Sequence, residues 1–489
     1  MVRRVALLIV ATLAVLGPLV ACGGGATAKG VGVAPSFPSA PVILISIDTL
    51  RADAVSGFGA PAAQTPHLAA IGDEGIRFER AIAASHITAP SHASMLTGFS
   101  CFVHGVAMGG QGKSWSIPAE IPTLAELLKW AGYRTAGFTD GIQLLPEGGF
   151  GRGFDVYDPL TLGLEMKLRR MIAFVQSSGD SPYFLFAHTY RPHQPYRAPQ
   201  DLVDELLAGY DGVYAEPARE ASALTHHAVM TSSPVQNRIT KALSGSRAKT
   251  DADRLFFRKL YDAGVVGADR EVGALLKGLR EVGALDRAIV IITSDHGEEF
   301  FEHGHDSHHT VFDEVIRVPL IIRLPKALGA GRRIETPVSS ISLVPTILEL
   351  TGVPPRIVHE GESIASSLLE GEPEARPVSA AWWTAISRFP GGRATRTRNL
   401  KQIDLIDGQS SLAFYKFGKL TVFDLSADPD ETKASAGAHP AEQRLIDEYL
   451  AEMRELWPRM RLRHRVESAG AAELSAEQIE ALRAVGYTR

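Results

Sequence analysis

Cysteine is almost absent from this chain, which has only Cys22 and Cys101 among its 489 residues. Two cysteines exclude a disulfide framework and any cysteine-rich metal site. An excess of one charge is also lacking, because 50 basic residues stand against 55 acidic ones and give a net charge of −5. No long basic run is present, which excludes a dedicated nucleic-acid-binding protein, since such proteins carry a basic surface.

Glycine (46 residues) and proline (29 residues) are only modestly more frequent than usual. This excludes a collagen-like, low-complexity or largely disordered protein. The length is ample for a large hydrophobic core, and it suits one large domain with an appendage or two to three smaller domains.

The N-terminus has the features of an exported chain. Arg3 and Arg4 precede an apolar stretch, Val5 to Val20, that is short for a membrane span. This stretch leads into Leu19-Val20-Ala21-Cys22, which resembles a bacterial lipobox. We therefore expect a lipoprotein signal peptide over residues 1–21, a lipid on Cys22 and a flexible tether over residues 22–40. An ordinary cleaved signal peptide or an uncleaved anchor is the alternative.

This interpretation predicts a bacterial cell-envelope protein, lipid-anchored at the periplasmic or outer face of a membrane. With Cys22 lipidated, Cys101 has no disulfide partner and is expected to be a buried free thiol.

Short apolar runs alternate with helix-like stretches after residue 40. Asp48, His188 and Asp295 each come directly after such a run. The alternation predicts an α/β fold, with a mostly parallel sheet and helices on both faces. In such folds the chemistry lies at the carboxyl ends of the strands. The expected strands are 41–47, 133–138, 183–187, 288–293 and 318–323, and the expected helices are 65–74, 91–96, 121–131 and 251–282.

The pattern changes along the second half of the chain. Residues 200–250 are irregular and are expected to insert over one edge of the sheet. Beyond about residue 378, short strands (396–407 and 412–425) and helices (440–453 and 475–484) predict a small antiparallel α+β subdomain. The expected domains are therefore a catalytic domain, 41–377, and a C-terminal subdomain, 378–489.

Three segments, each at a predicted strand end or helix start, contain candidate metal-binding or catalytic residues. Asp48 is placed to bind a cation, although a lone Asp commonly caps a turn. Thr88 lies just before Pro90-Ser91, at a predicted helix N-terminus where anions are stabilised. Asp295-His296 opens a segment with five histidines in fourteen residues, which indicates a metal or phosphate-type site rather than a solvated loop. His188 and His193 form a further pair, equally consistent with a surface loop or a site.

Taken together in this order, these segments resemble the sulfatase family of the alkaline phosphatase superfamily. The resemblance covers almost the whole chain from residue 41. It rests on Asp48 to Asp53, Pro90-Ser91 with Leu96-Thr97-Gly98, His193 to Tyr196, Ser294 to Glu298, Glu314 to Ile322 and Val422 to Glu431.

The sequence departs from the family at the nucleophile. Family sulfatases have Cys or Ser where this chain has Thr88, and that residue matures to formylglycine; oxidation of Thr cannot give the aldehyde. His92 replaces the motif Arg, Thr49 replaces a second Asp, and His296 replaces the usual Asn. Thr88 instead resembles the nucleophile of superfamily phosphodiesterases and of phosphoglycerol or phosphoethanolamine transferases.

The resemblance implies one divalent metal, Zn²⁺, Mn²⁺ or Ca²⁺, held by Asp48, Thr88, Asp295 and His296. Thr88 would attack the ester, and His193 or His188 would protonate the leaving oxygen. A second metal using His303, His308 or His309 is possible, with its ligands left open. The candidate substrate-binding residues are His92, His303, His308, His309 and Arg51, although Arg51 is as well suited to a structural ion pair with Asp53.

The predicted function is a metal-dependent, sulfatase-family hydrolase of sulfate or phosphate esters, with phosphoesters favoured by Thr88. A phosphoryl transferase that modifies a glycan or lipid is the first alternative, and a non-catalytic binding lipoprotein is the second. The expected partners are a small-molecule, glycan or lipid ester and, through the anchor, a membrane; no nucleic-acid partner is expected, and the oligomeric state is left open.

Overall fold

The computed structural model describes residues 33–106, 113–159, 163–223, 250–382, 392–406, 417–435, 437–463 and 471–473. The signal peptide, Cys22, most of the tether and the expected helix 475–484 lie outside this part of the chain. Within the described ranges, no helix combines the length and the apolar character that a membrane crossing requires.

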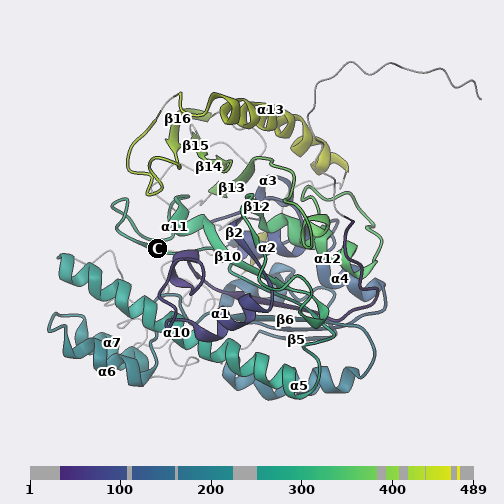
Figure 1. Ribbon diagram of the computed structural model, residues 1–489, viewed down its shortest axis with the longest axis horizontal. Coiled ribbons are helices and arrows are strands. Elements are labelled where there is room, and N and C mark those ends of the chain that lie inside the picture. The colour runs from purple at the N-terminus through teal and green to yellow at the C-terminus, as the bar shows by residue number, and fades with distance from the viewer. Residues whose placement is uncertain are drawn as a thin grey trace, which may run out of the picture.

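A nine-stranded mixed sheet forms the centre of the molecule (Figure 1). Its central strand, β1, runs parallel to β6 on one side and to β7 on the other. The strands, in sheet order, are β11 (Arg333–Ile334), β2 (Ile76–Ile82), β10 (Arg317–Arg323), β7 (Ile289–Thr293), β1 (Val42–Ile47), β6 (Tyr183–Thr189), β4 (Arg134–Phe138) and β5 (Val156–Asp158), with β12 (Val338–Ser339) paired to β2.

The prediction of a mostly parallel sheet with helices on both faces is confirmed. β10 is the exception, because it runs antiparallel to both β2 and β7. Every residue of β1 is buried, as expected for a strand covered on both faces. His188 lies within β6 rather than after it, since β6 continues to Thr189.

The side chains of β1 alternate between two hydrophobic cores, as the pleat of a strand requires. Ile43, Ile45 and Ile47 pack with α10 and its neighbours, whereas Val42 and Leu44 pack with α2, α4 and α12. The first face carries α1 (Pro66–Asp73), α5 (Leu164–Ser178), α6 (Gln200–Ala208), α7 (Ala215–Ala223) and α10 (Asp251–Glu281). The opposite face carries α2 (Thr88–Thr97), α4 (Leu124–Trp130) and α12 (Leu343–Thr351), with α3 (Cys101–His104) beside α2.

The long helix α10 has a clear local start signal. The Thr250 hydroxyl accepts a hydrogen bond from the Asp253 backbone N–H, and the Asp253 carboxylate accepts one from Thr250 N–H. This capping box satisfies two of the free N–H groups of the first turn. The inserted segment that follows β6 contributes α6 and α7, while residues 224–249 lie outside the described part.

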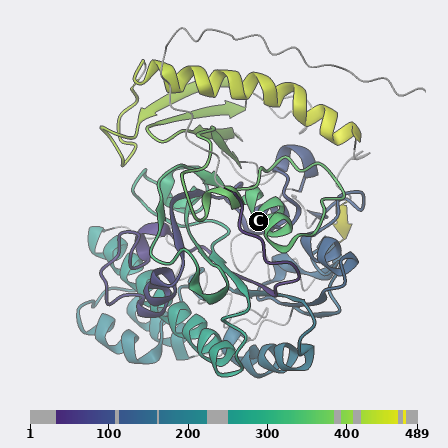
Figure 2. The same ribbon diagram turned by 45° about the vertical axis from the view of Figure 1, so that its right-hand side comes forward.

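A four-stranded antiparallel sheet and a long helix form the C-terminal part, above the central sheet in Figure 2. This confirms the small antiparallel sheet expected near the C-terminus. Its elements are β13 (Val378–Trp382), β14 (Gly392–Arg396), β15 (Leu400–Ile406), β16 (Phe417–Asp424) and α13 (Pro440–Arg463), which extends ten residues beyond the expected end at 453.

Further short elements are η1 (Ala52–Ala54), η2 (Ile142–Leu144), β3 (Lys113–Trp115) paired with β17 (Ala471–Glu473), β8 (Glu299–Phe300) paired with β9 (Asp306–Ser307), and α11 (Asp313–Ile316).

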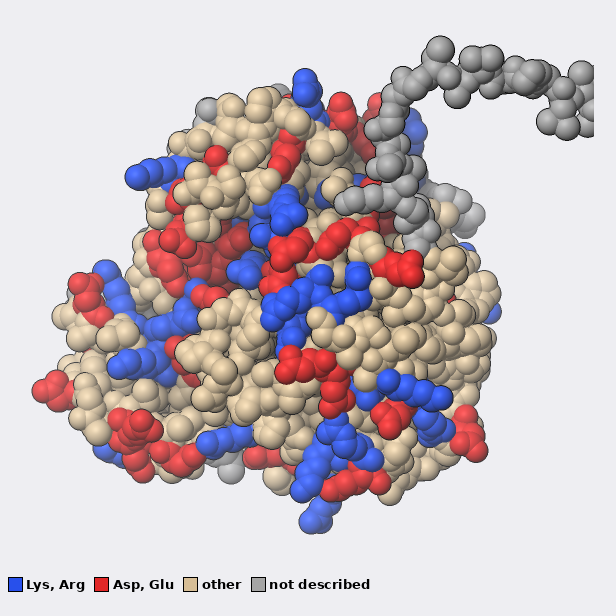
Figure 3. All heavy atoms as spheres, in the orientation of Figure 1, with Lys and Arg blue, Asp and Glu red and all other residues tan. Residues whose placement is uncertain are grey.

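On the face drawn in Figure 3, blue and red side chains alternate over the described residues rather than gathering into one basic surface. This distribution agrees with the near balance of charges in the sequence.

Candidate metal centre and active site

The carboxyl ends of two adjacent parallel strands bring three of the predicted metal ligands together. Asp48 follows β1, and Asp295 with His296 follows β7; Ser46 of β1 pairs with Thr293 of β7. One ligand atom from each of Asp48, Asp295 and His296 lies within 4.8 Å of the other two. All three side chains are fully buried.

Thr88 joins this group as the first residue of α2. Its Oγ1 lies 3.3 Å from Asp48 Oδ2 and 3.3 Å from His296 Nε2. The structure therefore assembles all four residues of the predicted metal set. Because Thr88 starts a helix, the positive end of the helix dipole lies beside its hydroxyl, which favours an anionic group there.

Hydrogen bonds from the backbone and from neighbouring helices fix the loops that carry Asp48 and Asp295. Thr49 N–H donates to Asp295 Oδ1 (3.2 Å), and Ser91 Oγ, on α2, donates to the Asp295 carbonyl (2.6 Å). Tyr261, on α10, donates its hydroxyl to the Thr49 carbonyl (2.8 Å) and accepts from Arg51 N–H (2.9 Å). Thr49 itself has φ +53°, a backbone conformation that costs free energy in a non-glycine residue and that its neighbours hold in place.

The carboxylates retain two buried oxygens, Asp48 Oδ1 and Asp295 Oδ2, that have no hydrogen-bond partner in the described part of the chain. Burial, followed by the charge of Asp295, raises the pKa of Asp48 well above its usual range. Two buried carboxylates that repel each other and leave oxygens unpaired are satisfied by a cation. With the His296 imidazole and the Thr88 hydroxyl, these residues fit a divalent metal.

Three further histidines surround this group. His188 Nε2 lies 3.3 Å from Asp48 Oδ2, and its Nδ1 donates to the Asp140 carbonyl (3.0 Å). The His308 ring lies 4.5 Å from that of His296 and 5.4 Å from that of His193. Burial lowers the pKa of His188 and of His308, and it lowers that of His193 to about 3. All three are therefore neutral imidazoles near pH 7 when the site holds neither metal nor substrate.

His193 is oriented by its own loop. Its ring stacks on Tyr190 with centroids 4.1 Å apart, and its Nδ1 donates to the Gln194 carbonyl (2.7 Å). With the proton on Nδ1, the lone pair lies on Nε2. The loop therefore lies beside the candidate metal group, since the His193 ring is 5.4 Å from that of His308. The acid role of His193 stays a prediction.

His92 and Arg51 make contacts that are structural in kind. His92 is fully buried, with Nε2 2.9 Å from Ser46 Oγ and Nδ1 2.9 Å from the Thr88 carbonyl, and burial lowers its pKa to about 3. Arg51 forms a two-pronged ion pair with Asp53 (2.7 and 2.8 Å) and a second ion pair with Glu302 (2.5 Å). The ion-pair alternative for Arg51 is thus realised, and substrate binding by either residue stays a prediction.

The histidine-rich segment is divided by a short hairpin. β8 and β9 pair so that Glu299 faces Ser307 and Phe300 faces Asp306. His308 follows β9 at the base of this hairpin, near His296, whereas His303 lies in its turn and contacts Glu314 instead. His309 is half-buried beside His308. His303 and His308 therefore lie in different surroundings, and a second metal that uses His303, His308 or His309 stays a prediction.

Two residues that lie beside Thr88 or beside the contacts of His188 carried no signal in the sequence. Gln143 Oε1 accepts from Ala89 N–H (3.1 Å), and its buried Nε2 has no hydrogen-bond partner among the described residues. Lys167, on α5, is fully buried and donates to the Thr139 carbonyl (2.5 Å) and to Asp140 Oδ1 (3.1 Å). Both lie on segments whose amphipathic pattern gives no hint of a site, so only packing reveals them.

Glu298 was visible in the sequence as part of the Ser294-to-Glu298 motif but had no assigned role. Its Oε1 lies 3.2 Å from His308 Nδ1, and burial raises its pKa well above the usual range. It therefore orients His308 at the edge of the metal group.

Comparison with known proteins identifies the family. The family model for sulfatases matches residues 41–353, and the model for the N-sulphoglucosamine sulphohydrolase C-terminal region matches residues 301–457. The chain belongs to the sulfatase family. It is accordingly a hydrolase of ester bonds, and divalent metal use is a property of this family.

Two of the proteins similar to this sulfatase-family chain have names or titles that refer to a sulfated sugar, and a third is a phosphonate monoester hydrolase. An N-acetylglucosamine-6-O-sulfatase from Bacteroides thetaiotaomicron is 25% identical over 468 residues, covering 80% of this chain and 81% of its own. A structure in complex with its substrate D-glucosamine-2-N,6-O-disulfate has a TM-score of 0.67 and 21% identity, covering 88% of this chain and 99% of the other. A phosphonate monoester hydrolase from Silicibacter pomeroyi shares the fold with a TM-score of 0.62 and 20% identity, covering 85% and 95%.

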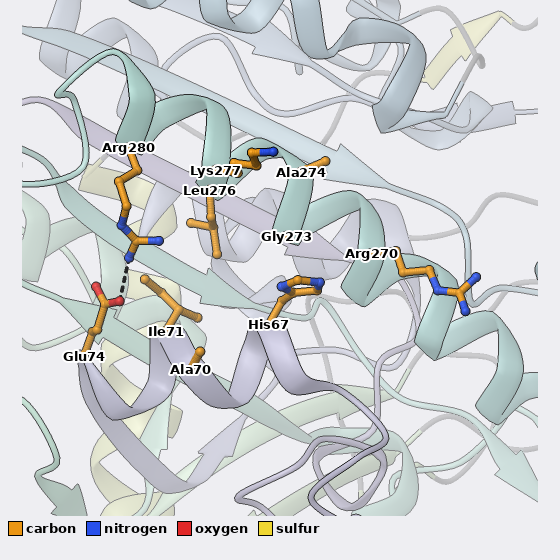
Figure 4. Close-up of a pocket in the computed structure, with 10 residues that line it drawn as sticks. All are labelled: His67, Ala70, Ile71, Glu74, Arg270, Gly273, Ala274, Leu276, Lys277 and Arg280. Atoms are coloured by element: carbon orange, nitrogen blue, oxygen red, sulfur yellow. Dashed lines mark hydrogen bonds and ion pairs between the residues drawn. The ribbon is translucent and has the colours of Figure 1, made fainter.

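The sulfatase-family chain also has a pocket of about 350 Å³ between α1 and α10 (Figure 4). Its charged side chains are already paired: Arg280 with Glu74 (2.5 Å), and Arg270 with Asp201 (2.8 Å). None of the four residues of the metal set lines it, so it is separate from the active site.

Proposed function

We propose that this sulfatase-family enzyme uses the unmodified Thr88 hydroxyl as its nucleophile. The observation that carries the proposal is the position of Thr88 Oγ1, 3.3 Å from both Asp48 Oδ2 and His296 Nε2 at a helix N-terminus. A bound divalent cation would lower the pKa of this hydroxyl and offset negative charge on the ester. With an imidazole among the ligands, Zn²⁺ or Mn²⁺ suits the set better than Ca²⁺, which prefers oxygen ligands alone.

Asp48 and His193 would each carry out one proton transfer in this reaction. Thr88 loses its proton toward the adjacent Asp48 carboxylate as its oxygen forms a bond to phosphorus or sulfur, and the bond to the leaving oxygen breaks. His193 gives a proton to that oxygen, after the negative charge of the substrate has raised the imidazole pKa from its low value. Attack by water on the Thr88 ester then releases phosphate or sulfate and restores the hydroxyl.

Gln143 is placed to bind the group that is transferred. Its Oε1 is held by Ala89 N–H, next to the nucleophile, which leaves the two N–H donors of Nε2 free for a non-bridging ester oxygen. The orientation of the amide is determined by this bond, because a backbone N–H requires an acceptor. Donors fixed before the reaction stabilise charge that develops in the transition state.

Thr88 also carries the preference for phosphoesters. A threonine ester has no second hydroxyl on the same carbon that could expel the bound group, so water must attack phosphorus or sulfur directly. The proposed substrate is therefore a phosphoester, and the names of the relatives point to an ester carried on a sugar.

The test compares aryl sulfate, aryl phosphate monoester and aryl phosphodiester as substrates of the metal-loaded wild type. We expect phosphoester turnover to dominate, and mass spectrometry of the acid-quenched enzyme to locate a phosphoryl group on Thr88. Preferred turnover of the sulfate ester would overturn the phosphoester assignment. A rate that appears only with an added alcohol acceptor would favour the transferase, and absence of turnover with metal bound and ligand affinity retained would favour the binding lipoprotein.

We also propose that the enzyme is anchored in the bacterial cell envelope through a lipid on Cys22. The support is the order of Arg3-Arg4, the short apolar stretch and the lipobox-like Leu19 to Cys22. Detergent phase partitioning of the expressed wild type and of Cys22→Ser tests this: the wild type should enter the detergent phase and the variant should not. Equal partitioning of the two proteins would contradict lipidation.

A further inference from the structure

We propose a second divalent-metal site, separate from the active site, formed by His303, Glu314 and Glu431 between the catalytic part and the C-terminal sheet. One ligand atom from each of these residues lies within 4.8 Å of the other two. None of the three belongs to the group formed by Asp48, Asp295 and His296. The site does not depend on the proposed nucleophile or substrate.

Two of the atoms that face one another here lack hydrogen bonds. Within the described part of the chain, His303 Nε2 and Glu314 Oε2 are buried atoms without a hydrogen-bond partner, whereas Glu431 Oε1 contacts the Lys401 ammonium. The side chains of His303 and Glu431 are only 9% and 1% exposed. Buried polar atoms normally find partners, and two that converge with a third carboxylate from separate segments indicate a missing common partner.

The spacing matches a coordinated ion better than a hydrogen bond. His303 Nε2 lies 3.4 Å from Glu314 Oε1, which is long for a charge-assisted hydrogen bond of about 2.7–2.9 Å. Ligands about 2.1 Å from a tetrahedral ion lie about 3.4 Å from each other. One imidazole and two carboxylates form a ligand set for Zn²⁺ or Mn²⁺, with a fourth position for water.

Neighbouring groups hold two of the ligands in orientation, as the surroundings of metal ligands commonly do. The His303 ring stacks on Phe312, with centroids 3.6 Å apart and planes 13° apart. Glu431 Oε2 accepts from Asp313 N–H (2.7 Å) and from Lys401 Nζ (3.0 Å). Glu431 is thus held in place by Asp313 and Lys401, with one of its oxygens within 4.8 Å of ligand atoms of His303 and Glu314.

Lys401 must be weighed, because its ammonium lies 2.8 Å from Glu431 Oε1 and repels a cation. A carboxylate oxygen has two lone pairs, so the ammonium and a metal can share it. Arg396 and Lys401 pair with the carboxylates of Asp313 and Glu431, and the charge of Arg317 also acts on Asp313. Glu314 has His303 as its partner, so the rival to a metal is a proton on His303.

A metal here would join two parts of the molecule. His303 lies in the β8–β9 turn and Glu314 in α11, both beside the central sheet, whereas Glu431 follows β16 of the C-terminal sheet. The ion would fasten the C-terminal part to the catalytic part, and its loss should destabilise their contact rather than remove a reacting group.

The experiment measures metal content and unfolding temperature of the full chain after chelation and titration with Zn²⁺. We expect the wild type to bind two equivalents, Asp48→Asn to retain one, His303→Gln to retain one, and the double variant to bind none. Zn²⁺ should raise the unfolding temperature of Asp48→Asn but not that of the double variant. If no metal binds at the active site, the wild type should instead bind a single equivalent, and His303→Gln should remove it.

Glu314→Gln provides a second route if His303→Gln does not fold, since Glu314 has some exposure and should also reduce the content by one equivalent. Glu362→Gln is the matched control, because Glu362 pairs only with the exposed Arg376 among the contacts described, and two equivalents should remain. An unchanged content of two in both His303→Gln and Glu314→Gln overturns the site. A wild-type content of one that Asp48→Asn abolishes also overturns it, and leaves a protonated His303 as the explanation.

Discussion

Replacement of Thr88 tests the reaction most directly. In Thr88→Ala the hydroxyl disappears, and the two polar atoms that lie 3.3 Å from it belong to a carboxylate and an imidazole that the metal set requires. Neither replaces the nucleophile, so only water attacking the ester directly remains. We expect kcat to fall by at least about 10³-fold, which corresponds to about 4 kcal/mol of transition-state stabilisation.

Thr88→Ser is the matched control, because it keeps the hydroxyl and deletes one methyl group from a fully buried side chain. The lost methyl should cost about 1 kcal/mol of stability. Turnover should remain within a few-fold of the wild type, since the oxygen is still present.

The assay is steady-state turnover of the best aryl ester with metal in excess, together with metal content and unfolding temperature for each variant. The reasoning is refuted if Thr88→Ala binds metal, stays folded and retains turnover within tenfold of the wild type. Water, not Thr88, would then be the nucleophile.

Three further predictions concern other residues. Gln143→Glu keeps the acceptor for Ala89 N–H but replaces the free donors with a negative oxygen, so the inhibition constant of inorganic phosphate should rise at least tenfold; an unchanged constant would remove Gln143 from the anion site. Burial raises the pKa of Glu299 from 4.5 to about 8, so the native state keeps a proton that the unfolded chain releases, and stability should fall by a few kcal/mol as the pH rises from about 4.5 to 8. Denaturant titrations should show this slope in the wild type and a shallower one in Glu299→Gln, whereas parallel curves would contradict it. Burial also raises the pKa of Cys101 to about 12, so in a Cys22→Ser background iodoacetamide at pH 8 should label it only as the chain unfolds; labelling of the native protein within minutes would contradict this.

The strand runs and their ends were readable from the sequence because they depend on local pattern. A strand buried on both faces is largely apolar, and β1 and β7 are, with Ser46 and Thr293 as their polar residues. A polar residue that follows the end of such a parallel strand lies at the carboxyl end of the sheet. This is why Asp48 and Asp295, far apart in the chain, could be expected together, and why Thr88 could be placed at a helix start.

The direction of β10 could not be read in this way. The run Arg317–Arg323 has the same apolar pattern whether the strand is parallel or antiparallel to its neighbours. The short connection through the β8–β9 hairpin and α11 decides the direction, and that connection depends on packing.

The sequence by itself determined the fold class and the family, and it named the four residues of the predicted metal set that the fold brings together, because each follows from the residue types at the ends of local elements. The tertiary structure decided which of the remaining polar residues lie beside the predicted metal set and which lie elsewhere. The hairpin turn carries His303 away from His296 and toward Glu314 and Glu431, although the sequence places these histidines in one cluster. Folding likewise brings Gln143 against Ala89, next to Thr88, since contacts between distant segments leave no periodic trace in either segment.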